Sequence, residues 1–370
     1  MRVLLVSTSY PRDVSDWRGI FMRHLVAALT RVPTLKLSVW APPGDLPEEA
    51  TAVVSSSDAR WLNELMASGG ISHMMRKGGR KAWFAPMRLL LMMGRSYRAN
   101  LEVDIYHINW LQCALPLPGN LKPALVTVLG NDLKLLKLPF MRHLLRRVMK
   151  RHRVTICPNA DWMEAPLQRA FGDVAKIRPV SFGIDPSWYA IERKAHHGRP
   201  YCWVAVTRLT ANKLGPLFTW SKDLFLEGAR ELHLFGPMQE GIEVPDWVHY
   251  HGSVTAEQLA NEWFPKACGL ITLSRHAEGR PQVMLEAMAS GLPIIASRMP
   301  AHESIVFDGE TGRLCDAVES YGAALLELEG ETANRRMGDA ARRWAAREIG
   351  TWDDCAHRYA QIYSELLGVE

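Results

Sequence analysis

Residues 269–297, GLITLSRHAEGRPQVMLEAMASGLPIIAS, contain the local pattern that decides the fold. Apolar runs at 269–273 and 294–297 have the length and composition of buried strands. Between them, Pro281 suits the first turn of a helix, and Gly291 suits its end. A strand, a helix and a strand in this order are typical of α/β proteins with parallel sheets.

The same alternation of short apolar runs and longer amphipathic segments extends over the whole chain. It predicts an α/β fold with two Rossmann-like, doubly wound lobes that face each other across a cleft. A polar segment at 191–200 is the predicted linker between a lobe over 1–190 and a lobe over 201–352, and a C-terminal helix over 353–370 could cross back to the first lobe. Strands are expected at 3–7, 35–40, 104–108, 125–129, 154–157 and 177–181, and then at 201–207, 232–235, 248–250, 269–273 and 294–297.

Length and composition are those of a globular protein. The chain has 370 residues, of which 48% are hydrophobic and 22% charged, and it is too long for a single hydrophobic core. No stretch reaches the ~18 uncharged apolar residues of a membrane-spanning helix, and no secretory signal pattern is present, so we expect a cytosolic protein. The six cysteines lie far apart without metal-ligand spacing, so we expect reduced thiols and no metal site.

Positive charge is concentrated in the first half of the chain, although the formal net charge is only +5. No carboxylate lies between Glu64 and Glu102 or within 134–153, and the first stretch mixes its cations with long apolar side chains. This composition favours an anionic membrane surface or nucleic acid as partner, and a solvated helix face opposite a core stripe is the alternative. The cations are Arg76, Lys77, Arg80, Lys81, Arg88, Arg95 and Arg98, followed by Lys134, Lys137, Arg142, Arg146, Arg147, Lys150, Arg151 and Arg153.

The loops that follow the strands indicate the ligand class. No G-x-G-x-x-G opens a helix after the first strand and no GxxxxGK[ST] occurs, which argues against an NAD enzyme and a phosphate-loop NTPase. Gly19 precedes the amphipathic run 20–29, where free backbone N–H groups could meet an anion or form a plain N-cap turn. Arg208 and Lys213 follow the strand at 201–207, and two cations in one loop suit a diphosphate, or a basic surface loop.

Two glutamates frame the helix of the quoted segment. Glu286 lies within this apolar helix, where burial is costly unless a polar group meets it, and a hydroxyl-rich ligand would do so. Glu278 precedes the helix and could accept hydrogen bonds from a second set of hydroxyls, while the turn at 279–282 presents unpaired N–H groups. Two glutamates at this spacing also arise by chance, so their combination with Arg208 and Lys213 carries the argument.

Together these motifs resemble the retaining, two-Rossmann-lobe glycosyltransferases of family 4, which have a GT-B type of fold. The resemblance lies in R-L-x-x-x-K-x-G at 208–215 and E-G-x-P-x(4)-E-A-M-A-S-G-L-P at 278–293. Further matching segments span nearly the whole chain: Tyr10, Pro11, Gly19 and Phe21; DIYHINW at 104–110; VTVLGND at 126–132; the GID-aromatic segment at 183–188; and DGETGRL at 308–314.

The resemblance implies a role for each matching residue of the donor site. In the C-terminal, nucleotide-sugar-binding lobe, Glu286 corresponds to the glutamate that holds the ribose hydroxyls, and Glu278 to the one that faces the donor sugar. Arg208 and Lys213 correspond to the cations that neutralise the diphosphate, and Gly19 to the glycine whose N–H approaches it from the N-terminal lobe. The implied donor-binding residues are Gly19, Arg208, Lys213, Glu278, Gly279, Arg280, Pro281, Gln282 and Glu286.

In the N-terminal, acceptor-binding lobe, the sequence departs from the family pattern. His107 corresponds to the histidine-containing segment near the anomeric centre, but the family often has His-x-His where this chain has Asn109 in the second position. After Ser297, the usual Gly-Gly is replaced by Met-Pro-Ala at 299–301. The implied catalytic residues are Glu278, His107, Arg208 and Lys213, and the acceptor-side candidates are Asn109, Trp110, Asn131 and Asp132.

The resemblance therefore implies a retaining hexosyltransferase that moves a sugar from a nucleoside-diphosphate sugar, of UDP or GDP type, to a hydroxyl of a lipid-linked or cell-envelope glycan such as lipopolysaccharide or exopolysaccharide. No D-x-D motif occurs, so we expect metal-independent transfer without a cofactor. We expect a cytoplasmic protein, peripheral on the inner face of the cytoplasmic membrane, without a nucleic-acid partner. A sugar-nucleotide epimerase or phosphorylase, and a non-catalytic nucleotide-sugar or nucleic-acid binding protein, are the alternatives.

Overall fold

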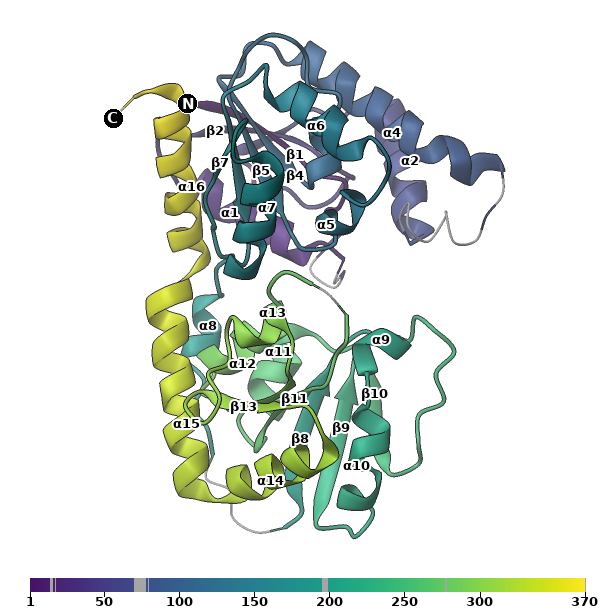
Figure 1. Ribbon diagram of the computed structural model, residues 1–370, viewed down its shortest axis with the longest axis vertical. Helices are drawn as coiled ribbons and strands as arrows, with labels where there is room; N and C mark the ends of the chain where they lie inside the picture. The colour runs from purple at the N-terminus through teal and green to yellow at the C-terminus, as the bar shows by residue number, and fades with distance from the viewer. Residues whose placement is uncertain are drawn as a thin grey trace. The chain divides into compact units, whose positions relative to one another are not determined.

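The computed structural model describes residues 1–13, 16, 18–69, 78, 80–194, 199–276 and 278–369, and for residues 80–83 the backbone alone. The chain forms two compact units, domain 1 (Met1–Phe182 and Trp352–Glu370) and domain 2 (Gly183–Thr351) (Figure 1). Each is a parallel sheet covered by helices, so the predicted α/β class with two Rossmann-like domains is confirmed. Domain 2 begins before the expected linker, and Ile191 of that segment is buried in the domain 2 core.

The sheet of domain 1 has seven parallel strands in the order β3-β2-β1-β4-β5-β6-β7. Successive residues of β1 point to opposite faces, so that Val3 and Leu5 enter one core and Leu4 and Val6 the other. The strand order reverses between β1 and β4, which is where open parallel sheets bind ligands. The strands are β1 (Arg2–Val6), β2 (Lys36–Trp40), β3 (Ala50–Ala52), β4 (Ile105–Asn109), β5 (Ala124–Val128), β6 (Val154–Pro158) and β7 (Lys176–Ile177).

Helices cover both faces of this sheet. The helices α1 and α16 lie side by side on one face, and α2, α4, α6 and α7 pack on the other (Figure 1). The helix α16 thus returns to domain 1 after the whole of domain 2. The helical elements are α1 (Ile20–Thr30), α2 (Ser56–Ala67), α4 (Arg80–Ala99), η1 (Leu111–Ala114), α5 (Asp132–Leu135), α6 (Met141–Met149), η2 (Asp161–Met163), α7 (Glu164–Phe171) and α16 (Trp352–Leu367).

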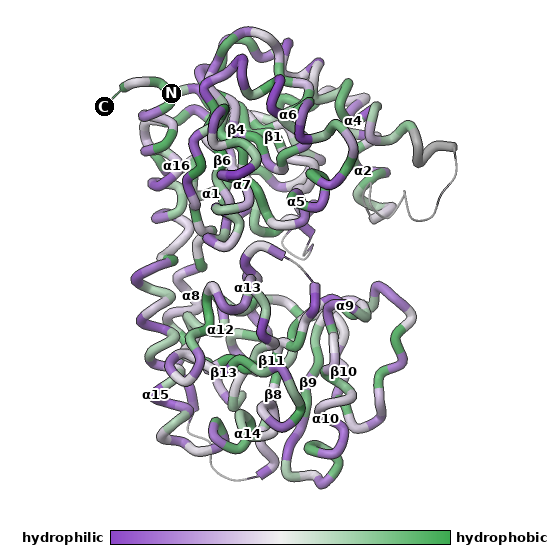
Figure 2. The backbone as a smooth tube through the Cα atoms, viewed as in Figure 1, coloured by the Kyte–Doolittle hydropathy of each residue, from purple (hydrophilic) through white to green (hydrophobic). Residues whose placement is uncertain are grey.

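The sheet of domain 2 has six parallel strands in the order β10-β9-β8-β11-β12-β13, and its order reverses between β8 and β11. Apolar residues fill the central strands, as the hydrophobic colour along β8 and β11 in Figure 2 shows. Helices cover both faces of the sheet, which is why its central strands are nearly continuous apolar runs. The strands are β8 (Tyr201–Val206), β9 (Arg230–Phe235), β10 (Val248–Gly252), β11 (Gly269–Thr272), β12 (Ile294–Ser297) and β13 (Gly312–Cys315).

The helices of domain 2 form two layers. Residues of α8, α12 and α15 pack into one core, and residues of α10 and α14 into the other. Among the described residues, no helix is both long and apolar enough to cross a membrane. The helical elements are α8 (Pro186–Tyr189), α9 (Ala211–Leu214), α10 (Leu217–Phe225), α11 (Ala256–Gln258), η3 (Leu259–Trp263), α12 (Gln282–Ala289), α13 (Pro300–Glu303), α14 (Val318–Glu329), α15 (Glu331–Trp344) and η4 (Ala345–Ile349).

The strands differ from the expectation at three places. The strands β3 and β13 were not expected. The strand β3 has only three residues, none of them buried, and β13 overlaps the end of the DGETGRL motif. The expected strand at 177–181 is reduced to Lys176–Ile177. The chain beyond β7 still follows β6. The N–H groups of Arg178 and Val180 donate to the carbonyl oxygens of Ile156 and Pro158, at 2.9 Å each.

Candidate functional site

Two glycines bring the loops of domain 2 together at the carboxyl ends of β8, β9 and β11. Gly236 has a φ of +130°, and a Cβ atom there would lie 1.8 Å from the carbonyl oxygen of Thr207. Gly215 has a φ of +55°, and its Cβ atom would lie 2.0 Å from the carbonyl oxygen of Leu273. Only glycine permits such backbones and approaches, so these two positions hold loop 207–215 against the neighbouring strand ends.

The predicted cation Lys213 and the predicted carboxylate Glu278 form an ion pair. The Lys213 Nζ atom donates to Glu278 Oε2 at 2.5 Å, and the two side chains are only 12% and 21% exposed. Thr210 positions the lysine by capping α9, where its side chain accepts a hydrogen bond from the Lys213 backbone N–H. Burial lowers the pKa of Lys213, the charge of Arg208 lowers it further, and Glu278 opposes both. The structure therefore brings Glu278 to the loop for which the sequence predicted the cation pair Arg208 and Lys213.

Glu286 projects from α12, as expected, and its carboxylate has no hydrogen-bond partner in the described part of the chain. Burial raises the pKa of Glu286 to about 7, and the charge of Asp185 adds to the rise. Strongly shifted pKa values without a compensating partner are typical of ligand-binding positions. The arrangement suits a ligand that brings hydroxyl donors to this carboxylate.

The start of α12 contains the remaining donor-site candidates. Gly279, Arg280 and Pro281 are buried, and the helix begins one residue after Pro281. The Gln282 side chain donates from Nε2 to the carbonyl oxygen of Gly183 at 2.9 Å. This bond attaches the GID segment to α12, which gives Gln282 a structural role within domain 2.

One histidine at this edge was not predicted. His302 lies on α13, directly after the Met-Pro-Ala departure at 299–301, and it is fully buried. Its Nδ1 atom lies 2.8 Å from the Ser297 carbonyl oxygen, and its Nε2 atom has no hydrogen-bond partner in the described chain. The signal in the sequence was the departure itself, since a polar residue that follows an inserted proline turn at a strand end warrants attention.

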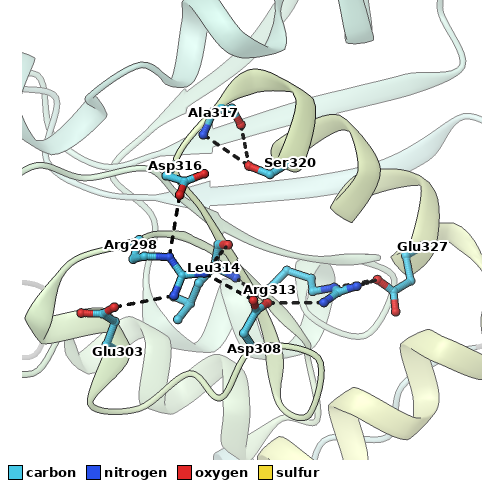
Figure 3. Close-up of polar contacts among 9 residues, drawn as sticks. All are labelled: Arg298, Glu303, Asp308, Arg313, Leu314, Asp316, Ala317, Ser320 and Glu327. Carbon is cyan, nitrogen blue, oxygen red and sulfur yellow. Dashed lines mark hydrogen bonds and ion pairs between the residues drawn. The ribbon is translucent and has the colours of Figure 1, made fainter.

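An ion-pair network holds the segment from which His302 projects. Figure 3 shows Arg298 among three carboxylates, those of Glu303 at 3.7 Å, Asp308 at 3.4 Å and Asp316 at 4.0 Å. Asp308 also accepts a hydrogen bond from the Leu314 backbone N–H at 3.1 Å, which ties the network to β13. The loop therefore has a defined shape without the usual Gly-Gly.

In domain 1, Gly19 lies at the start of α1, and its predicted role at the diphosphate stays a prediction. It caps α1 with a φ of +75°, and a Cβ atom would lie 2.4 Å from Ser9 Oγ and 3.2 Å from the backbone nitrogen of Tyr10. The N-terminus of α1 thus packs closely on the loop that follows β1. Its first-turn N–H groups lie at the carboxyl edge of the sheet, where an anion could be bound.

The expectation for His107 is wrong as a catalytic group. This histidine is fully buried beneath α16, where its ring atoms bond to Tyr363 Oη at 2.5 Å and to Thr127 Oγ1 at 2.9 Å. Burial lowers the pKa of His107 to about 3, so the ring is neutral. Because both nitrogens are occupied within the core and no surface is exposed, His107 cannot contact a substrate in this arrangement.

Asn109 is placed differently, at the carboxyl end of β4. It is fully buried, and neither its Oδ1 nor its Nδ2 atom has a hydrogen-bond partner among the described residues. The next residue, Trp110, has a φ of +68°, which is rare for a bulky side chain, and its ring packs edge-on against Phe21 at 6.4 Å. Buried orphan amides and strained backbone cluster at functional sites, so the second position of the motif is the better candidate.

The last two acceptor-side candidates separate from each other. Asp132 is buried and accepts backbone hydrogen bonds from Leu111 at 3.0 Å and Leu129 at 2.8 Å, and burial raises its pKa. Both carboxylate oxygens therefore join the segments that follow β4 and β5. Asn131 is exposed beside it, so Asp132 shapes this edge while Asn131 remains accessible.

Comparison with known proteins agrees with this architecture. Residues 224–330 match the family described as Glycosyl transferases group 1. A sucrose-phosphate synthase from Thermosynechococcus elongatus is structurally similar over 100% of this chain and 99% of that one, with a TM-score of 0.73 and 16% identity. Anabaena Alr3699/HepE in complex with UDP and glucose is similar over 98% and 99%, with a TM-score of 0.66 and 13% identity. This chain has the fold of the GT-B glycosyltransferases.

The GT-B fold and the group 1 match confirm the resemblance found in the motifs. A curated relative, the D-inositol 3-phosphate glycosyltransferase of Streptomyces coelicolor, is 33% identical over 127 residues. That alignment covers 34% of this chain and 27% of the relative, so the chain spans about a quarter of the relative's length. The group 1 region contains Glu278, Glu286 and His302, whereas Arg208 and Lys213 precede it.

Proposed function

We propose that this protein is a glycosyltransferase that moves a sugar from a nucleoside-diphosphate sugar to an acceptor hydroxyl. The observation that carries the proposal is the Lys213–Glu278 ion pair, which lies with Arg208 at the adjacent carboxyl ends of β8 and β11. A diphosphate would pair with Lys213 and with the guanidinium fork of Arg208. Glu278 would then be free to accept hydrogen bonds from the sugar hydroxyls.

Glu286 would bind the nucleoside. Its carboxylate has two oxygens without partners in the described chain, and two ribose hydroxyls would supply the missing donors. Because burial raises the pKa of Glu286 to about 7, hydroxyl donors would stabilise the charged form and release a proton near neutral pH. The carboxylate is therefore a recognition group for the ribose rather than a nucleophile.

The proposed reaction is a retaining transfer. The bond between the anomeric carbon and the diphosphate oxygen breaks, the acceptor oxygen bonds to the same face of that carbon, and the acceptor proton passes to the departing diphosphate oxygen. Arg208 and Lys213 would stabilise the negative charge that develops on this oxygen, an electrostatic effect worth several kcal/mol in a site that excludes water. With two cations in this role and no D-x-D motif, we propose that transfer requires no metal ion.

We assign the donor to domain 2 and the acceptor to domain 1. The orphan carboxamide of Asn109 can both donate and accept hydrogen bonds, and Trp110 offers an aromatic surface beside it. Neutral amides and aromatic rings suit sugars and other polyols, which expose both hydroxyls and apolar ring faces. A glycan or lipid-linked glycan is thus the acceptor class that domain 1 suits.

We further propose that domain 1 contacts an anionic membrane surface. Leu89 and Met92 of α4 are buried in the core, whereas Phe84 is 71% exposed and Met87 and Leu91 lie on the same outer side. The helix therefore uses one face for packing and presents a second apolar face in a stretch without carboxylates. Of the cations, Arg76 and Lys77 lie outside the described residues, and for Arg80 and Lys81 only the backbone is described.

The second basic stretch has a similar exposed apolar group. Phe140 is 79% exposed with a φ of +62°, and Leu138 and Leu144 are exposed around it. Arg146 forms an ion pair with Asp173 at 2.5 Å, whereas the other cations of 134–153 form no ion pair with a carboxylate of the described residues. Apolar side chains between cations can enter the headgroup region while the cations meet phosphate groups.

A ligand panel tests the reaction class. We expect one of UDP, GDP, ADP or dTDP to raise the unfolding temperature of domain 2, because a ligand at 100 times its Kd stabilises by about 2.7 kcal/mol. Glu286→Ala should abolish this shift, and Glu310→Ala, which removes an exposed glutamate of the same domain, should not. If no nucleotide shifts the wild-type protein, the proposed function is wrong.

Flotation with vesicles tests the membrane proposal separately. Wild-type protein should float with phosphatidylglycerol vesicles at low salt and less at high salt. The pair Phe84→Glu and Phe140→Glu should release the protein from the vesicles and leave nucleotide binding intact. Failure of the wild type to float at low salt would favour a water-soluble acceptor.

A further inference from the structure

Three neighbouring strands of domain 2 end in one group of polar side chains. The strand order places β8, β11 and β12 next to one another. Lys213 follows β8, Glu278 follows β11, and His302 follows β12. The carboxyl ends of parallel strands meet at one edge of a sheet, so His302 belongs to the same edge as the Lys213–Glu278 pair.

The environment of His302 confirms this placement. The charges of Glu278 and Lys213 both act on its pKa, in opposite directions, while burial lowers the pKa most strongly. Glu286 is influenced instead by Asp185, on the segment before α8. His302 is therefore grouped with the residues proposed to meet the sugar and diphosphate, and not with the proposed ribose carboxylate.

The hydrogen bonds of His302 define which nitrogen carries the proton. Its Nδ1 atom lies 2.8 Å from the carbonyl oxygen of Ser297, and a carbonyl oxygen can only accept. The ring therefore donates from Nδ1 and, because burial keeps it neutral, Nε2 has a free lone pair. No hydrogen-bond donor reaches this buried atom within the described residues.

The segment that carries His302 is held firmly. The Ser297 side chain donates to the Ser274 carbonyl oxygen at 2.6 Å, which joins the ends of β11 and β12. Arg298 contacts Glu303, Asp308 and Asp316 (Figure 3). Pro300 is the first residue of α13. The position of Nε2 is therefore fixed, because the Nδ1 side of the His302 ring is anchored to Ser297.

We propose that His302 binds the transferred sugar, with Nε2 accepting a hydrogen bond from one of its hydroxyls beside Glu278. This inference rests on the proposed function. An unprotonated nitrogen repels phosphate oxygens, which have no hydrogen to donate when ionised, so the diphosphate is excluded as its partner. A hydroxyl is the group of a nucleoside-diphosphate sugar that can fill this position, and His302 is therefore a residue that selects which sugar is bound.

Two substitutions separate binding from structure. His302→Asn keeps an amide donor near the Nδ1 position, so the bond to Ser297 is retained while the Nε2 acceptor is lost. His302→Gln places an amide near the Nε2 position and gives up the bond to Ser297. His249→Asn, at an exposed histidine of β10, is the matched control.

Calorimetric titration with UDP, UDP-glucose, GDP and GDP-mannose tests the inference. We expect His302→Asn to bind the nucleoside diphosphate within twofold of the wild type and its nucleotide sugar at least tenfold more weakly. His302→Gln should recover part of the nucleotide-sugar affinity, and His249→Asn should match the wild type. If His302→Asn does not fold, His302→Gln is compared with His302→Leu, because both lose the bond to Ser297 and only the glutamine keeps an acceptor near Nε2. His302→Gln should then bind the nucleotide sugar more tightly than His302→Leu, and equal affinities would overturn the inference.

Two other results would overturn the inference. Equal losses of affinity for the diphosphate and the nucleotide sugar would show a structural role, and unchanged affinity for the sugar would show no role in binding. A wild-type protein that binds none of the four compounds would instead contradict the proposed function on which the inference rests.

Discussion

The carboxyl ends of the two sheets bury different kinds of polar group. In domain 2 the buried side chains are ionisable, with Lys213 paired to Glu278 and Glu286 left without a partner in the described chain. In domain 1 the orphans at this edge are neutral amides, among them that of Asn109, and the buried carboxylate of Asp132 is already satisfied by backbone N–H groups. Two sheets of the same architecture thus present different chemistry, and the difference lies in the residues at and beyond the carboxyl ends of the strands.

The two edges differ in the free-energy cost of their buried, unsatisfied polar groups. A buried charge requires a countercharge or a ligand. Burial of an unpaired amide costs less free energy, so an amide can remain without a partner until a neutral ligand binds. The domain 2 edge is therefore suited to a diphosphate that brings charge. The domain 1 edge is suited to a ligand that brings hydroxyl groups alone.

The largest effect should come from removing a cation of domain 2. Arg208→Ala should lower kcat about 10²–10³-fold and change nucleotide affinity less, because the guanidinium is needed most when charge develops on the leaving oxygen. Steady-state kinetics with the nucleotide sugar found in the ligand panel would measure both constants. Arg335→Ala, at an exposed arginine of α15, is the control, and normal turnover of Arg208→Ala would remove the basis for the charged site.

A smaller effect is expected from Glu286→Gln, which should weaken nucleotide binding but stabilise the folded protein at high pH. Its pKa is raised from 4.5 to about 7, so the folded state holds this proton more tightly than the unfolded state does. The ionised carboxylate therefore costs stability that grows from about pH 4.5 to pH 7 and then stays constant, up to about 3 kcal/mol at 1.36 kcal/mol per pKa unit. Glu286→Gln should stabilise the protein at pH 8, not at pH 4, while nucleotide affinity falls at least tenfold.

Urea unfolding of Glu286→Gln and the wild type at the two pH values would measure this difference. A variant that is less stable than the wild type at pH 8 would show that the carboxylate has a stabilising partner. The contrast between an ionisable and a neutral edge would then be weaker than described above.

The smallest effect is expected at the neutral edge. Asn109→Leu replaces an orphan amide by an apolar group of similar size, so domain 1 should gain about 1 kcal/mol of stability. The acceptor KM should rise, and the nucleotide affinity should remain that of the wild type. Thermal unfolding and acceptor kinetics would measure the two changes, and a loss of stability would mean that the Asn109 amide is satisfied in the folded protein.

The motifs predicted the fold well because local patterns determine short buried strands. The strands β8, β11 and β12 begin at the expected residues, and the helix α12 begins next to Pro281. The residue types at the donor edge were equally readable, since Arg208 and Lys213 follow a strand end. Their contact partners were not, because the Lys213–Glu278 pair joins positions 65 residues apart.

His107 shows why the rest could not be predicted. Its side chain lies on the same face of β4 as Ile105, which belongs to the core beneath α1 and α16. The groups that satisfy it include Tyr363, which lies 256 residues later in the chain. No local sequence pattern indicates that α16 covers His107. The position of His107 in the motif alone therefore suggested an accessible ring.

The return of α16 to domain 1 has a consequence for synthesis on the ribosome. The residues of α16 that close the core around β4 and β5, among them Tyr359 and Tyr363, emerge only after all of domain 2 has been made. Until α16 is made, one face of the sheet in nascent domain 1 is partly uncovered. Domain 2 is continuous in the chain, so it can complete its fold first. The domain that is translated first is thus the one that is finished last.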